Sequence, residues 1–116
     1  MNYILQINGF RLLRKLRPIR ASSIVLYYVL LENFNQVGFP ETLEIPIATL
    51  SGESSLSLTT VRQARDELSR KGYILFTKGS SYTPSKYKLL ELDSRMVLNE
   101  ASKTAKPFAK EGAVNE

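Results

Sequence analysis

The sequence contains no cysteine and no histidine. The chain therefore cannot form disulfides or Cys/His zinc sites, and it has neither thiol nucleophiles nor the histidine bases of catalytic dyads and triads. Asp66 and Glu67 are the only adjacent acids, and we expect them to diverge on a helix surface, so no acid/base pair is apparent. We expect a protein without enzymatic activity, cofactor or bound metal.

Long hydrophobic runs are also missing. No apolar run approaches the roughly 20 residues that a membrane-spanning helix requires. The N-terminal residues show no positive patch followed by an apolar segment and a small-residue cleavage site, which is the pattern of a secretion signal. Hydrophobic residues make up 43% and charged residues 23% of the 116-residue chain, ordinary proportions for a globular domain. We expect a cytoplasmic domain with a tail and no membrane partner.

Charge is present in excess of one sign and is unevenly placed. Lys and Arg number 16 against 11 Asp and Glu, which gives a net charge of +5. Residues 1–20 carry five bases and no acid, residues 21–56 four acids and no base, and residues 57–90 seven bases and two acids. Two basic blocks around an acidic segment favour a surface that faces a polyanion, although solvated helices also carry charge.

Residues 1–20 form the first predicted segment. Asn8 is suited to cap a helix over residues 9–17, and Pro18 ends that helix because the residue before a proline avoids the helical conformation. The alternating apolar residues before Asn8 indicate either a short strand or the start of the helix. We expect this extension to mediate self-association into a homodimer or higher oligomer, since its apolar stripe is additional to the core helix that follows. The side chains predicted for this contact are Tyr3, Leu5, Ile7, Phe10 and Leu13.

The next segment predicts a helix at the centre of the core. Ser22 or Ser23 is expected to cap a helix that reaches Val37 and is closed by Gly38. Apolar positions cover most of its circumference, which is typical of a central helix. We assign its two adjacent tyrosines to packing rather than to a ligand site. The positions predicted to lie outside the core are Val25, Val29, Glu32, Asn33 and Gln36.

The remaining pattern predicts a helix, a turn, a second helix and a hairpin. Ser57 caps the second of these helices and Gly72 stops it. Arg65 lies on or beside the apolar face of this helix, and we expect its aliphatic stem to anchor the helix on the core. The pattern fades after the hairpin into a tail or linker over residues 93–116. The predicted strands are 43–45, 73–77 and 86–90, and the predicted helices are 46–53 and 58–71.

This order predicts a mainly helical α+β fold of the winged helix-turn-helix type over residues 21–92, with a wing of two to three strands. The second helix of such a domain is narrow enough to enter a DNA major groove about 12 Å wide. Double-stranded DNA is therefore the predicted partner. The predicted base-reading residues are Ser57, Thr59, Thr60, Arg62 and Gln63; Arg70, Lys71 and Lys78 suit phosphate contacts, and the loop and last strand add Ser80, Ser81, Tyr82 and Lys86.

Several stretches of the sequence together resemble one known family. The core helix ends in Asn-x-x-Gly-aromatic-Pro (residues 35–40), and residues 55–68 have the form Ser-Leu-x-x-x-x-Val-x-x-Ala-Arg-Asp-Glu-Leu. Lys-Gly-Tyr-Ile at residues 71–74 and Lys-Tyr at residues 86–87 follow. The ordered set is similar to the N-terminal winged-helix domain of DnaD-like replication proteins. These occur in low-GC Gram-positive bacteria and in their phages, where they are called replisome organisers.

The resemblance spans about residues 10–92 and implies a role in initiating DNA replication. It implies binding to origin or phage DNA, self-association and recruitment of the replicative helicase. In the family a second, helical domain usually follows and carries the helicase contact. The chain is then either a short stand-alone protein or the N-terminal piece of a longer one. The wing is less basic than is common in such domains, with only Lys78 before Lys86.

Other functions stay open at this point. A winged-helix transcription regulator has the same residue pattern, and only the resemblance favours replication. A protein–protein interaction module without DNA binding is a second alternative, because Glu53 would repel phosphate if it faced the groove. The basic helix of residues 9–17 could lie on a membrane surface, but its apolar stripe is more useful as core or as a dimer interface.

Overall fold

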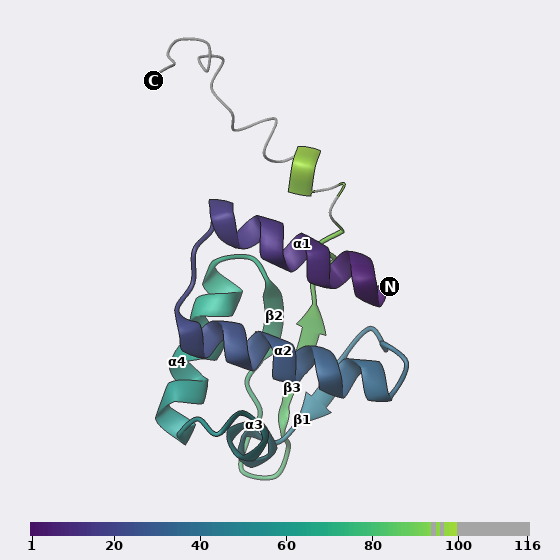
Figure 1. Ribbon diagram of the computed structural model, residues 1–116. Helices are drawn as coiled ribbons and strands as arrows, with labels where there is room; N and C mark the ends of the chain where they lie inside the picture. The colour runs from purple at the N-terminus through teal and green to yellow at the C-terminus, as the bar shows by residue number, and fades with distance from the viewer. Residues whose placement is uncertain (94, 96, 100–116) are drawn as a thin grey trace. The chain divides into compact units, whose positions relative to one another are not determined.

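The computed structural model describes residues 1–93, 95 and 97–99. The fold is α+β and mainly helical, as predicted (Figure 1). The chain divides into two compact units, one formed by Arg17–Glu91 with Met1 and the other by Asn2–Leu16 with the described residues from Leu92 onward. Most of the predicted tail, residues 93–116, lies outside the described residues. The elements are α1 (Tyr3–Leu16), α2 (Ala21–Gln36), β1 (Leu43–Ile45), α3 (Ile47–Ser54), α4 (Leu58–Arg70), β2 (Ile74–Thr77) and β3 (Ser85–Leu89).

The three strands form one antiparallel sheet in the order β1-β3-β2. Tyr87 of β3 is paired with Leu43 of β1 on one side and with Phe76 of β2 on the other. The rings of Tyr87 and Phe76 are stacked with centroids 6.1 Å apart. This cross-strand aromatic pair stabilises the register of a sheet whose strands are only three to five residues long.

The helix α2 is the centre of the core of the first unit, as its wide apolar surface predicts. It packs against α3 and α4. Tyr27 is fully buried and meets the ring of Tyr73 edge-on at 6.2 Å, which confirms that it packs in the core. The prediction was wrong at Val29, which is buried because packing on two sides covers a wider arc of the helix. The helix also ends at Gln36, one residue before the predicted Val37, which is exposed as its C-cap.

The start of α2 differs from the prediction. Its N-cap residue is Arg20, whose side chain makes no capping hydrogen bond. Neither Ser22 nor Ser23 is the cap; instead the Glu67 carboxylate of α4 accepts hydrogen bonds from the Arg20 N–H at 3.0 Å and from Ser23 Oγ at 2.5 Å. Glu67 is only 7% exposed, so its predicted surface position was wrong. The first turn of α2 is thus capped by another helix, from 47 residues away.

The helix α4 begins and ends close to its predicted limits. The side chain of Ser57 accepts a hydrogen bond from the Thr60 N–H at 3.1 Å, which confirms the predicted cap. Val61, Ala64 and Leu68 are buried on its inner face. Leu58, in the first turn of the helix, lies outside the core and is 42% exposed.

In the second unit, α1 is one continuous helix from Tyr3, so the alternative of a short strand was wrong. The cap is Asn2 rather than Asn8, because Asn2 Oδ1 accepts a hydrogen bond from the Leu5 N–H at 3.0 Å. Phe10 is buried, and the Arg14 guanidinium lies 4.7 Å from the centre of its ring. Sequence periodicity placed the start too late because Asn8 is a good capping residue by type alone.

Gly9 allows the chain after β3 to contact α1 closely within this unit. A Cβ atom at residue 9 would lie 1.1 Å from the carbonyl oxygen of Leu92, so no other residue fits there without moving main chain. The buried side chain of Gln6 accepts a hydrogen bond from the Leu92 N–H at 2.9 Å. Glycine at this position therefore serves close packing of two backbones rather than a turn.

Candidate nucleic-acid interface

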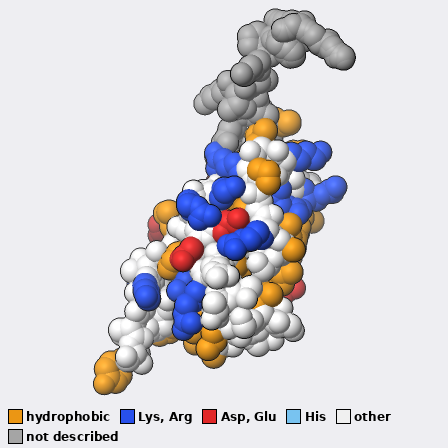
Figure 2. Space-filling view, turned by 90° about the vertical axis from the view of Figure 1, so that its left-hand side faces the viewer, with side chains coloured by type: hydrophobic (Ala, Val, Ile, Leu, Met, Phe, Trp, Pro, Cys, Tyr) orange, Lys and Arg blue, Asp and Glu red, His pale blue; other side chains and the backbone are white. Residues whose placement is uncertain are grey.

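The outer face of α4 is polar and mostly basic. Arg62, Gln63 and Arg70 are exposed there, with Asp66 the one acid among the exposed described residues of the helix. Figure 2 views the molecule from the side on which α4 lies in Figure 1 and shows Lys and Arg side chains with few acids among them. An amphipathic helix exposes this face because its opposite face is held in the core.

The hydroxyls at the start of α4 are engaged with one another. Ser57 Oγ donates to Thr60 Oγ1 at 2.9 Å and accepts from the Thr60 N–H. Thr59 is exposed beside them. Ser57 and Thr60 are thus engaged in the cap of α4. The other three predicted base-reading residues, Thr59, Arg62 and Gln63, are exposed and take no part in the cap.

The β2–β3 loop is held in shape by its own hydrogen bonds. The Ser80 N–H donates to the Thr83 carbonyl at 2.9 Å, and the Gly79 N–H donates to Ser85 Oγ at 3.1 Å. A Cβ atom at Gly79 would lie 2.0 Å from the Thr83 carbonyl oxygen, so the loop closes in this way only around a glycine. Tyr82 at its tip is 98% exposed.

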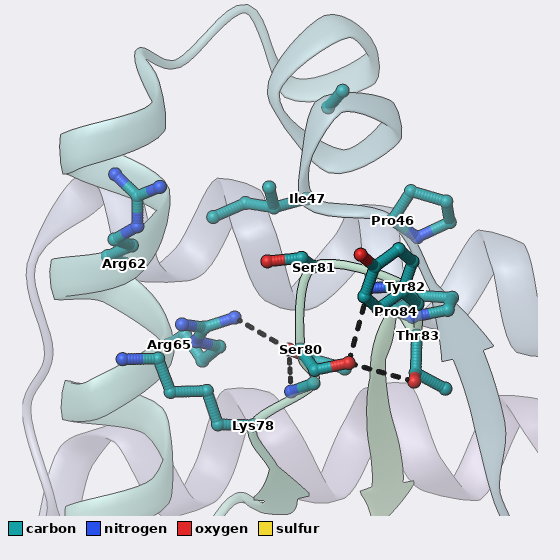
Figure 3. A pocket seen from close by; sticks show the side chains of 13 residues that line it. Pro46, Ile47, Arg62, Arg65, Lys78, Ser80, Ser81, Tyr82, Thr83 and Pro84 are labelled. Carbon is teal, nitrogen blue, oxygen red and sulfur yellow. Dashed lines mark hydrogen bonds between the residues drawn. The ribbon is translucent and has the colours of Figure 1, made fainter.

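A hollow of about 630 Å³ lies where this loop faces α4 and the start of α3 (Figure 3). We call it the Arg65 hollow, and it is lined by residues 46–48, 62, 65 and 78–85. It brings Arg62 and Lys78 together with Arg65, and none of the described residues that line it is acidic. Three cationic side chains without a carboxylate make this hollow positive in potential. Among the predicted site residues, Arg62, Lys78, Ser80, Ser81 and Tyr82 meet here.

Arg65 is 5% exposed, and its stem is buried with the core, as predicted. Its Nη1 donates to Ser85 Oγ at 3.3 Å and to Tyr87 Oη at 3.1 Å, and its guanidinium lies 4.6 Å from the centre of the Phe76 ring. Its Nε is buried and has no hydrogen-bond partner. Every described contact of this cation is thus with a neutral group.

Lys86 lies outside the Arg65 hollow. Together with Lys78 and Ser80 it lines a neighbouring hollow of about 290 Å³, which also contains Glu44. Glu44 and Lys86 are paired across β1 and β3. The acid reduces the positive potential on this side of the loop, so the two sides of the loop differ in charge.

Lys71 is held by the segment that precedes α2. Its Nζ donates to the Pro18 carbonyl at 2.8 Å, and its own carbonyl accepts a hydrogen bond from Arg17 Nη1 at 3.2 Å. Arg70 next to it is exposed. Of the two residues predicted to contact phosphate at this end of α4, Arg70 is exposed, whereas the Lys71 ammonium is tied at the surface to a main-chain carbonyl.

Glu53, the acid that would oppose phosphate, is bound to α2. Its Oε1 accepts a hydrogen bond from Asn33 Nδ2 at 2.7 Å.

In the part of the chain that the structure describes, no three acidic side chains gather in a way that would hold a metal ion. Over the same residues, no helix has the length and apolar character needed to cross a membrane.

The sequence pattern missed one member of the site. Arg65 was predicted to anchor α4 on the core and was not among the predicted DNA-binding residues, yet it also lines the hollow with Arg62, which lies three residues earlier on α4. The available signal was an arginine between Val61 and Leu68 on an otherwise apolar face.

Comparisons with protein-family models, curated proteins and solved structures gave no match to the chain.

Proposed function

We propose that the chain is a winged-helix protein that binds double-stranded DNA. In this proposal α4 enters the major groove and the β2–β3 loop is the wing. The observation that supports it best is the Arg65 hollow, in which cations from α4 and from the loop face one space without an acid. Phosphate neutralisation by such cations supplies most of the affinity of DNA-binding proteins.

The exposed residues of α4 divide into two roles under this proposal. Arg62 and Gln63 project from the helix near its start, where a recognition helix meets base edges, and their side chains suit guanine and adenine. Arg70 lies at the other end, where it would contact a phosphate and position the helix. Glu53, held by Asn33, need not face the groove.

The role in replication initiation rests on the resemblance to DnaD-like proteins. Residues 35–40 and 55–68 carry that resemblance, and with it come the proposed self-association and recruitment of a replicative helicase. Of the residues proposed for self-association, Phe10 and Leu13 are buried, while Tyr3, Leu5 and Ile7 are partly exposed. A monomeric mass by light scattering, with no change in association state when residues 1–9 are deleted, would contradict the proposed oligomer contact.

A protein-interaction module is the second candidate, and two exposed side chains favour it. The loop tip carries Tyr82, an aromatic side chain that is 98% exposed, and Leu58 is exposed at the start of α4. Exposed apolar side chains at the edge of a basic surface also suit a protein partner.

The direct test is duplex binding as a function of salt. Binding by phosphate neutralisation must weaken steeply between low and physiological salt, with a linear dependence of log K on log salt. Arg62→Ala with Gln63→Ala should reduce the preference among duplexes, whereas Arg70→Ala should weaken all of them alike. Lys88→Ala is the matched control, because it removes a charge that already pairs with Glu41. Absence of binding to any duplex at low salt would contradict the proposal and favour the protein partner.

A further inference from the structure

The buried positive charge of Arg65 is not balanced by its neighbours in the core. Arg65 as a whole residue is only 5% exposed, so its guanidinium has lost much of its hydration, which is costly unless an opposite charge or a full set of acceptors replaces the water. Its described partners are two hydroxyls and an aromatic ring. The positive charge therefore has no counter-charge within the described residues.

The guanidinium also has donors to spare. Its Nε is enclosed and makes no hydrogen bond, and both described hydrogen bonds of the group leave from Nη1. Buried donors in folded proteins nearly always have an acceptor, so an orphaned donor that lies beside a positively charged hollow supports an acceptor from outside the chain. In Figure 3 the Arg65 side chain extends from α4 toward the loop, with Lys78 beside it.

The surroundings of Arg65 determine what that acceptor is. Arg62 lies one turn away on α4, Lys78 comes from the loop, and Ser81 adds a hydroxyl, while the Ser80 hydroxyl is hydrogen-bonded to Thr83 within the loop. The start of α3 lines the same hollow, and its N-cap, Pro46, provides no side-chain acceptor for the first N–H groups of the helix. Positive charge, hydroxyls and the N-terminal end of a helix converge on one space.

We propose that the Arg65 hollow is a binding site for a single phosphate group, with Arg65 as its central ligand. A phosphate carries enough negative charge to balance the buried guanidinium, and its several oxygens can accept hydrogen bonds from α3, α4 and the loop at once. A volume of about 630 Å³ leaves room for the organic group that carries the phosphate. This site does not require that the chain bind DNA, because a free phosphate ester and a DNA backbone present the same group.

The charge on Arg65 makes an unusual prediction about stability. We expect replacement of this buried charge by an apolar side chain of similar length to be neutral or stabilising, because it removes the cost of keeping the charge out of water. Arg65→Met should therefore unfold at an equal or higher temperature than the wild type in phosphate-free buffer, and it should lose the stabilisation that phosphate gives the wild type. An arginine that served only to anchor α4 would give the opposite result, a variant of lower stability whose response to phosphate is unchanged.

The experiment is a titration of the full chain with inorganic phosphate at constant ionic strength, with chloride as the reference salt. Binding is followed by amide chemical shifts and by thermal unfolding. We expect saturable shifts at Gly79, Ser80 and Ala48, and a loss of about tenfold or more in affinity for Arg65→Met. Lys78→Ala removes an exposed charge of the hollow without touching the core, so it tests the site even if Arg65→Met fails to fold. Lys88→Ala is the control.

Two outcomes would overturn the site. The first is a wild-type response to phosphate no larger than to chloride, and the second is an affinity in Lys78→Ala and Arg65→Met equal to that of the control. A duplex added to the phosphate-bound protein then distinguishes the source of the group. Displacement of phosphate by duplex identifies the DNA backbone, whereas phosphate binding without duplex binding identifies a small phosphate ester and contradicts the proposed function while supporting the site.

Discussion

Arg20, at the start of α2, and Arg65, within α4, are two arginines whose charges are treated in opposite ways. Arg20 keeps 53% of its side chain in solvent and still binds a buried carboxylate, Glu67, through Nε at 3.3 Å and through its main-chain N–H. Arg65 is almost fully buried and contacts only neutral groups. A charge that the fold neutralises joins two helices, whereas a charge left without a partner beside a hollow is available for a ligand.

The largest effect on stability is expected at Glu67, the carboxylate that neutralises Arg20. Glu67→Ala removes the acceptor for the Arg20 N–H and for Ser23 Oγ, both of which lie at the start of α2. We expect a loss of about 2–3 kcal/mol in the free energy of unfolding, because the partly buried Arg20 N–H loses its acceptor and the buried Ser23 hydroxyl keeps only a long hydrogen bond to the Ala64 carbonyl. Urea unfolding measures this. Asp66→Ala is the control, since it removes an exposed acid from the adjacent position and should change stability by less than about 0.5 kcal/mol. Equal values for the two variants would show that the carboxylate does not hold α2.

The next largest effect concerns the β2–β3 loop, which lines the Arg65 hollow. Gly79→Ala places a methyl group against the Thr83 carbonyl, so the β2–β3 loop must open. We expect the closed conformation of the loop, which positions Lys78 and Ser80, to be destabilised by about 1–3 kcal/mol. Phosphate affinity should fall while the amide shifts of α2 stay as in the wild type. Gly52→Ala is a suitable control, because a Cβ atom there meets nothing within 4 Å. A Gly79→Ala protein with wild-type phosphate affinity would show that the loop does not contribute to phosphate binding.

A smaller effect is expected when the exposed partner of Glu67 is removed. Arg20→Ala deletes the ion pair and the contact of Arg20 Nη2 with the Gln63 carbonyl, but the main-chain N–H and Ser23 still bind the carboxylate. We expect a loss of about 0.5–1 kcal/mol in urea unfolding, as for ion pairs with one partner in solvent. A loss as large as that of Glu67→Ala would place the stabilisation in the charge pair rather than in the cap.

The smallest effect appears only on acidification. Burial by itself raises the pKa of the Glu67 carboxyl, but the hydrogen bonds from Ser23 and Arg20 together with the charge of Arg20 outweigh it and hold the pKa below the usual 4.5. Because the folded-state pKa is depressed, the stabilisation is present above the unfolded-state value and is lost as the pH falls from about 4.5 through the folded-state pKa. Urea unfolding from pH 7 to pH 3 should show a steeper loss for wild type than for Glu67→Gln. Parallel curves would contradict the assignment.

The order and type of the main elements could be predicted because their signals are local. The cap at Ser57, the apolar spacing of Val61, Ala64 and Leu68, and the short strands around a polar loop all act within a few residues. The prediction was wrong where a competing local signal was stronger than the real one. Asn8 has the character of a cap, but the helix had already begun after Asn2.

The candidate site was predicted only in part. Arg62, Lys78 and the loop serines were chosen by residue type and position, and they do line one hollow. The role of Arg65 in that hollow could not be predicted, because it depends on a serine and a tyrosine of β3 that lie 20 and 22 residues away. Lys71 has the right charge for a phosphate contact, yet only the folded chain shows that its Nζ binds the Pro18 carbonyl.

The sequence by itself determined a mainly helical α+β chain with a central apolar helix, an amphipathic basic helix and a polar loop, because hydrophobic period and turn residues act over short distances. Tertiary structure alone decided which charges are neutralised. Glu67 reached the start of α2, and Arg65 was left among neutral groups beside a hollow, because the balance between desolvation and pairing depends on neighbours that only folding brings together.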